Sequence, residues 1–121
     1  KLDSLQPALR ADEFRALQDR VATVKIDASL YDYMLDLVEK TRAHEQVHTG
    51  ISPRGTLALL HAAQAYAFVM GRDFLVPDDI KAMLVPVGAH RMITRTHSND
   101  GDLSKATAIL EQILESVPVP G

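Results

Sequence analysis

The segment from Gly50 to Arg54 has the residue types and spacing of an anion-binding helix start. Ser52 is a good N-cap, and Pro53 suits the first helical position, where no backbone N–H is needed. Arg54 then falls in the first turn, where the partial positive charge disfavours a cation by a few tenths to about 1 kcal/mol. A phosphate there would satisfy the amides, the dipole and the guanidinium together. We hypothesise that Ser52, Pro53 and Arg54 bind a phosphate; the alternative is a surface arginine whose repulsion from the dipole is screened by water.

Other titratable residues give weaker signals. His44 and His48 are four residues apart and could share one helix face and bind zinc, but structural zinc takes four ligands, often thiolates, so two exposed loop histidines are the favoured interpretation. Asp78 and Asp79 resemble an acid–base pair or a magnesium site, yet their place in a first helical turn is explained by the helix dipole. His61 lies in an apolar segment and is interpreted as packed or partly exposed. We predict no metal site.

Two arginines follow further along the chain. Arg91 and Arg95 lie beside His90 and His97. They could face a nucleotide or a neighbouring subunit, and the alternative is a solvated basic patch near a helix end. The sequence leaves the role of Arg91 open.

The motifs that normally complete a nucleotide site are missing. The sequence has no Gly-x-x-x-x-Gly-Lys-Ser/Thr loop to hold phosphates, and no apolar strand ending in paired acids to hold magnesium. The chain starts with Lys1, and we interpret it as a fragment of a longer protein. We therefore expect it neither to hydrolyse ATP nor to bind it tightly alone.

Composition excludes several classes of protein. The 121 residues suit one compact domain, and 46% of them are hydrophobic, enough for a single core. The chain has no cysteine, which rules out disulfides, thiolate metal sites and cysteine nucleophiles and fits a cytoplasmic location. The net charge of -3 argues against a nucleic-acid binder, and no apolar run approaches the length of a membrane span.

The hydrophobic periodicity predicts an all-α bundle of four to five helices with short extended segments that could pair. Asp27 or Ser29 can cap the second helix, Gly71 is a natural stop for the third, and Pro86 is expected to end the fourth. The third helix is apolar nearly all round, which is typical of a central helix. The predicted helices span about 11–21, 30–43, 53–70, 77–85 and 104–117, and the segments 44–51 and 98–102 are predicted to be loops.

Several blocks of sequence, in the right order, resemble the lid of MoxR-type AAA+ ATPases. The resemblance covers nearly the whole chain, from about Phe14 to Pro118. It departs from the family at Ile51 and Gly55, where smaller and alanine-like residues are expected. The blocks are Ile51-Ser52-Pro53-Arg54, Leu57-Ala58-Leu59-Leu60 with Ala62-Ala63, the run from Gly71 to Lys81, and His90-Arg91.

This resemblance implies a function for the parent protein. The chain would be a single C-terminal lid domain, 1–121, and Arg54 would be the sensor-two arginine, reaching ATP held by a preceding P-loop domain. ATP and magnesium would be the cofactors of the parent protein. The parent would form a cytoplasmic ring, such as a hexamer, and would assemble or activate other proteins, including partners with a von Willebrand factor A domain. No nucleic-acid or membrane partner is implied.

Two other interpretations remain open at the level of sequence. The first is a helical protein-interaction module with no nucleotide role, which would have no reason to place Arg54 at a helix start. The second is a helix-turn-helix binder of nucleic acid, which would need a basic recognition helix where the central helix is nearly uncharged.

Overall fold

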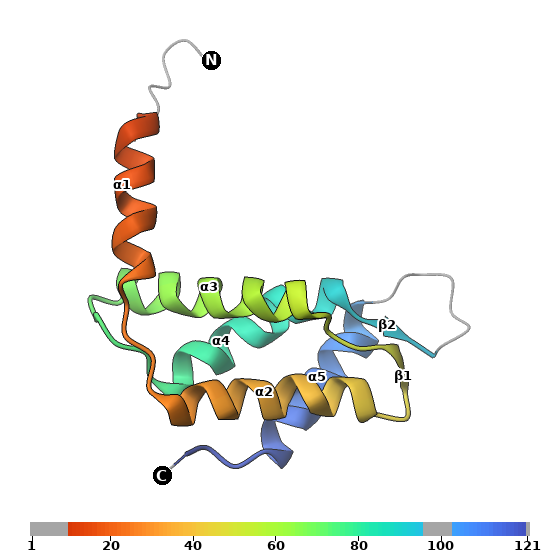
Figure 1. Cartoon of the computed structure of the whole chain (residues 1–121). Coiled ribbons are helices and arrows are strands. Elements are labelled where there is room, and N and C mark those ends of the chain that lie inside the picture. Colours follow the sequence, from red (N-terminus) through yellow and green to blue (C-terminus); the bar gives the residue numbers. More distant parts are fainter. Residues whose placement is uncertain (1–9, 96–102, 121) are drawn as a thin grey trace.

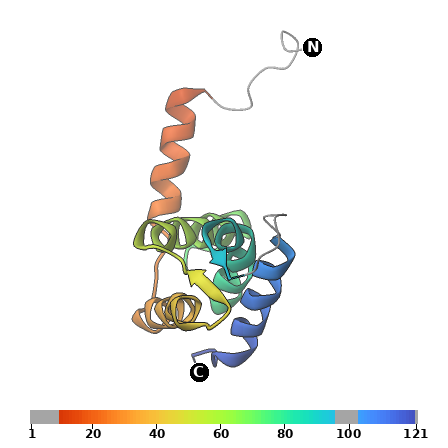
Figure 2. The ribbon, with the colours of Figure 1, turned by 90° about the vertical axis from the view of Figure 1, so that its right-hand side faces the viewer.

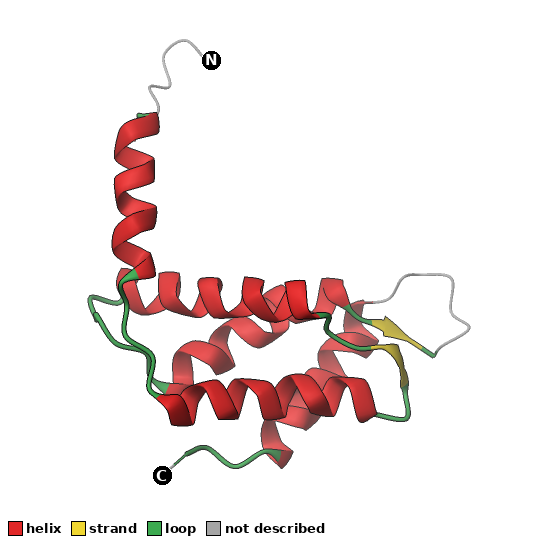
Figure 3. Cartoon of the chain, viewed as in Figure 1, coloured by secondary structure: helices red, strands yellow, loops and turns green. Residues whose placement is uncertain are grey.

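The computed structural model describes residues 10–95 and 103–120. Within them the chain forms five α-helices, one short 3-10 helix and two very short strands (Figures 1 and 3). In chain order the elements are α1 (Ala11–Ala22), α2 (Ala28–Ala43), β1 (Val47–Thr49), α3 (Pro53–Val69), α4 (Pro77–Gly88), η2 (Ala89–Arg91), β2 (Ile93–Thr94) and α5 (Leu103–Ser116). The predicted all-α fold is confirmed.

Local signals in the sequence set three of the helix boundaries: the starts of α2 and α3 and the end of α3. Asp27 caps α2, because its carboxylate accepts the backbone N–H of Ser29 at 3.0 Å. Ser52 caps α3 in the same way, with Pro53 at the first helical position. Gly71 has a φ of 84°, the left-handed conformation that ends a helix and that glycine adopts without a steric penalty.

The core lies where α2, α3, α4 and α5 pack together (Figure 2). α3 and α4 make the most extensive contact, and α5 lies against α2, α4 and η2. Ala63 and Ala67 of α3 are fully buried, and their small side chains let neighbouring helices approach closely. The largest fully buried side chains come from four helices and from the linker before α3. They are Leu37, Val38 and Thr41 of α2; Ile51 of the linker; Leu59 of α3; Asp79, Ile80 and Leu84 of α4; and Leu110 of α5.

Two sequence predictions were wrong in detail. α4 continues through Pro86 to Gly88 and then into η2. Proline removes one backbone hydrogen bond, but its fixed φ is compatible with a helix, and the packing of Gly88 and Leu84 in the core outweighs that loss. The segment 44–51, predicted to be a loop, contains β1, which pairs antiparallel with β2. The predicted loop 98–102 lies outside the described residues.

α1 stands apart from the bundle. It rises from one end of the body (Figure 1), and none of its residues is buried. Its C-terminal end is held by the Arg20 guanidinium, 5.1 Å from the centre of the Phe68 ring. Gln64 of α3 adds a hydrogen bond from its side-chain amide to the carbonyl of Val24, at 3.0 Å. An apolar groove of about 450 Å³ separates α1 from α3.

None of the helices in the described residues is both long enough and apolar enough to cross a membrane.

Candidate functional site

The predicted anion-binding segment lies at the start of α3. The Ser52 hydroxyl oxygen accepts the backbone N–H of Gly55 at 3.1 Å, and the Ser52 carbonyl accepts the Thr56 hydroxyl at 2.9 Å. Pro53 and Arg54 are the first two residues of the helix. The structure therefore confirms that Arg54 lies in a first helical turn, as its neighbours in the sequence predicted.

The charge at this end of α3 is not neutralised by the rest of the described chain. The first turn contains no acidic residue, in contrast to α1 and α4, which each have two. Arg54 is exposed and makes no hydrogen bond or ion pair within residues 10–95 and 103–120. A helix N-terminus and a free guanidinium thus face solvent together, which favours an anion.

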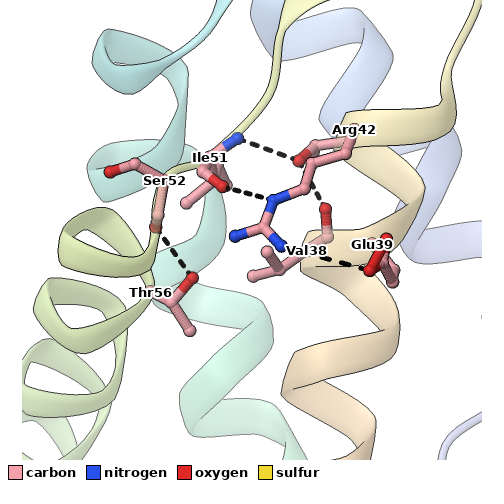
Figure 4. A network of polar contacts seen from close by, with 7 residues as sticks. Val38, Glu39, Arg42, Ile51, Ser52 and Thr56 are labelled. Carbon is pink, nitrogen blue, oxygen red and sulfur yellow. Dashed lines mark hydrogen bonds and ion pairs between the residues drawn. The ribbon is translucent and has the colours of Figure 1, made fainter.

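The residue that enters this turn is held by the end of α2 (Figure 4). The backbone N–H of Ile51 donates to the Thr41 hydroxyl oxygen at 3.1 Å. The Arg42 Nε donates to the Ile51 carbonyl at 2.9 Å. Both polar groups of the Ile51 backbone are therefore bound by two consecutive side chains of α2. This contact was not expected from the sequence, because nothing in the local spacing of residues predicts it.

The Ile51 side chain packs closely against the backbone of two glycines, Gly55 and Gly88. Ile51 is 1% exposed. A Cβ built on Gly55 would lie 2.9 Å from the Ile51 Cγ2, and one built on Gly88 would lie 3.0 Å from its Cδ1. Both distances are too short for a comfortable contact. The two departures from the family pattern therefore belong together, because the large residue at 51 occupies space that a methyl group at 55 would need.

Arg91 lies beside the same turn of α3. Its Cδ would be 3.0 Å from a Cβ on Gly55, and its Nη1 donates to the Val87 carbonyl at 3.2 Å. The structure thus brings Arg91 next to the residue that follows Arg54. Arg95 follows β2, where its backbone N–H donates to the Gln46 carbonyl at 2.9 Å.

The histidines are placed separately. His44 ends α2, where one ring nitrogen lies 3.2 Å from the Gln112 side-chain oxygen and the other accepts the backbone N–H of Gln46 at 3.0 Å. His48 lies on β1, so the two histidines do not share a helix face. His61 is exposed on α3 beside the groove next to α1. His97 lies outside the described residues, and the described part contains no group of three or more metal-ligating side chains.

Asp79 does more than complement the helix dipole, which was its predicted role. Its carboxylate is fully buried and accepts both terminal nitrogens of Arg72 at 2.6 Å, together with the backbone N–H of Val76 at 2.8 Å. The same ion pair raises the pKa of the Arg72 guanidinium. Asp78 remains exposed, as the dipole interpretation expects. Asp79 therefore joins the end of α3 to the start of α4, and it lies at the opposite end of α3 from Arg54.

Comparisons with known proteins agree with the resemblance seen in the sequence. The AAA lid domain family matches residues 39–113. Uncharacterized protein YeaC of Bacillus subtilis is 38% identical over 98% of this chain and 37% of its own length. Chaperone MoxR1 of Mycobacterium tuberculosis is 29% identical over 93% of this chain and 32% of its own length.

A solved structure has the same fold. The crystal structure of a proposed ATPase from Cytophaga hutchinsonii superposes with a TM-score of 0.79 and 27% identity, over 91% of this chain and 36% of that one. This chain spans about a third of the length of each of these relatives.

Proposed function

The chain belongs to the AAA lid domain family, of the type found in MoxR proteins, and from this premise we propose that Arg54 is a sensor-two arginine contacting the terminal phosphate of ATP. The observation that carries the proposal is the isolation of Arg54. It is exposed at the capped N-terminus of α3, in a turn without acids and without a partner in the described residues. Ser52 and Pro53 complete the site, because they form the turn that presents the guanidinium.

The chemistry of phosphoryl transfer gives such a group a clear use. Negative charge spreads over the phosphate oxygens in the transition state, and a cation already in position stabilises that charge. A first-turn arginine adds its own charge to the positive end of the helix. Both act in the same direction on a phosphate, so the electrostatic cost of placing Arg54 there is recovered when the anion binds.

The remaining parts of the ATP site would come from elsewhere in the parent protein. A preceding P-loop domain would hold the nucleotide and Mg²⁺, and this chain would be its C-terminal lid. We expect the isolated chain to lack ATPase activity, because the described residues offer only one side of a phosphate site. In the parent, a ring of identical subunits such as a hexamer would couple lid movement to the chaperone-like assembly or activation of partner proteins in the cytoplasm, including those with von Willebrand factor A domains.

The test compares two arginine variants in the full-length parent protein. Arg54→Ala is expected to lower the rate of ATP hydrolysis at least ten-fold, which corresponds to about 1.4 kcal/mol of transition-state stabilisation. Arg15→Ala is the matched control. Arg15 is also exposed, and it lies on α1 at the other end of the molecule from the start of α3 (Figure 1).

Nucleotide affinity is measured beside turnover. Loss of preference for ATP over ADP in Arg54→Ala alone would support contact with the terminal phosphate. Unchanged turnover and affinity in a folded Arg54→Ala protein would refute the proposal. The domain would then be a helical interaction module that shares only the architecture of a lid.

A further inference from the structure

We propose that Thr41 and Arg42, at the C-terminal end of α2, are positioning residues that set the direction of the first turn of α3 and thereby of Arg54. This inference rests on the proposed function of Arg54. Neither residue would touch the nucleotide. Both would act through the backbone of Ile51, whose N–H and carbonyl they bind at 3.1 and 2.9 Å (Figure 4).

The Thr41 side chain is itself held in place. It is fully buried, and its hydroxyl donates to the Val38 carbonyl at 2.6 Å. The hydroxyl hydrogen is therefore used within α2, and a lone pair of the oxygen remains for the N–H of Ile51. A buried N–H without a partner is costly, so the linker has one strongly preferred position on α2.

Arg42 holds the same linker through a second, independent contact. A Cβ on Gly50 would lie 2.8 Å from the Arg42 Cα and equally close to its Cγ, so the linker lies directly on the last turn of α2. Only glycine permits this approach. The Arg42 guanidinium also has Glu39 at 4.0 Å, one turn earlier. The side chain thus lies along α2 while its Nε reaches the Ile51 carbonyl.

The connection from Ile51 to Arg54 is short and stiff. Two residues separate them: Ser52, fixed by its capping hydrogen bond, and Pro53, whose ring locks φ. A rotation of the linker at Ile51 would therefore be passed on to the Arg54 side chain and change its direction, because neither residue between them is free to absorb the rotation. Placement within about 1 Å matters for a group that stabilises a transition state.

The rest of α3 does not depend on this contact. Leu59, Ala63 and Ala67 bury the middle and the end of the helix, with exposed fractions of 1%, 0% and 0%. Pro53 and Arg54 are exposed and make no side-chain hydrogen bond within the described chain. Loss of the Thr41 and Arg42 contacts should therefore leave α3 formed while its first turn loses a fixed direction.

The experiment is a double-mutant cycle in the full-length parent protein, between residues that do not touch. Thr41→Val removes the hydroxyl at nearly constant shape, and Arg42→Met removes the Nε donor while keeping an apolar stem. Each is expected to lower kcat and the preference for ATP over ADP by about three- to ten-fold, because misplacement of a catalytic group reduces the rate. In an Arg54→Ala background, each should have no further effect. Thr41→Ser, which keeps the hydroxyl, should leave both kcat and the preference for ATP over ADP close to the wild-type values.

The control separates positioning from simple stability. Arg72→Met breaks the ion pair with buried Asp79 at the other end of α3, so it perturbs the same helix without touching the linker. Its effect on the ATP preference should be small and independent of Arg54. Should Thr41→Val or Arg42→Met fail to fold, Arg42→Lys provides the milder loss of the same hydrogen bond.

The outcomes distinguish the two proposals. If Arg54→Ala reduces turnover while the Thr41 and Arg42 variants leave it unchanged, or reduce it independently of Arg54, the positioning role is refuted and the function of Arg54 survives. If Arg72→Met gives the same coupling to Arg54, the effect is general destabilisation and the positioning role is also refuted. If Arg54→Ala itself has no effect, both proposals fail.

Discussion

Replacing Gly55 by alanine is expected to change stability in opposite directions depending on the residue at position 51. With Ile51 present, the new methyl carbon would lie 2.9 Å from the Ile51 Cγ2 and 3.0 Å from the Arg91 Cδ. Overpacking of this kind costs about 1–3 kcal/mol. The better helix propensity of alanine offsets up to ~1 kcal/mol of that cost. We expect Gly55→Ala alone to lower the free energy of unfolding by about 1 kcal/mol.

The second half of the cycle removes the isoleucine. Ile51 is 1% exposed, so Ile51→Ala leaves a cavity and should lower the free energy of unfolding by about 2–5 kcal/mol. In that background the methyl group of Gly55→Ala enters the vacated space, and the exposed Arg91 side chain can shift to relieve its own close contact. The gain in helix propensity then dominates. The double variant should then be about 1 kcal/mol more stable than Ile51→Ala alone. The coupling energy is about 2 kcal/mol, within the range for residues in contact.

Urea denaturation of the 121-residue domain, followed by its helical circular dichroism signal, measures all four proteins. The control is Gly71→Ala. Gly71 has a φ of 84°, and no neighbour lies within 4 Å of the place that a methyl group would take, so its penalty is one of backbone conformation and should be the same in both backgrounds. If Gly55→Ala had the same effect with Ile51 and with alanine at position 51, to within about 0.5 kcal/mol, the size-exchange argument would be wrong.

Two further predictions concern α2. Tyr33→Phe should leave the free energy of unfolding unchanged or raise it by up to about 1 kcal/mol, because the Tyr33 hydroxyl is buried without a hydrogen-bond partner in the described residues. Urea denaturation measures the change. If the free energy of unfolding fell by more than ~1 kcal/mol, the hydroxyl would have a hydrogen-bond partner after all. Asp27→Asn should reduce the pH dependence of stability, because hydrogen bonds from the Ser29 hydroxyl and backbone N–H lower the pKa of Asp27 below 3.8. The extra stability of the wild-type protein is present above pH 3.8 and is lost as the pH falls through the lowered pKa of Asp27. A difference in the free energy of unfolding between the two proteins that stayed constant down to strong acid would contradict this prediction.

The sequence by itself determined the features that depend on near neighbours. The N-cap at Ser52, the proline at 53 and the stop at Gly71 each act over a few residues, and the structure confirms all three. For α2 the sequence offered Asp27 or Ser29 as the cap, and the structure selects Asp27. The same local signals placed Arg54 in the first turn of α3. The apolar character of α3 predicted a central position, and here the prediction was wrong: α3 packs mainly against α4, and its Leu57 and Val69 side chains are exposed.

Only the tertiary structure decided the contacts between elements that are distant in the chain. Three features depend on where whole helices pack. They are the buried ion pair of Asp79, the pairing of β1 with β2, and the hydrogen bonds of Thr41 and Arg42 with the Ile51 backbone. Helix periodicity states which face is buried but not which partner lies opposite, so none of these contacts has a local signal. The residue that would meet phosphate could be read from the sequence, whereas the residues that orient it required the fold, because orientation is set by packing across the chain.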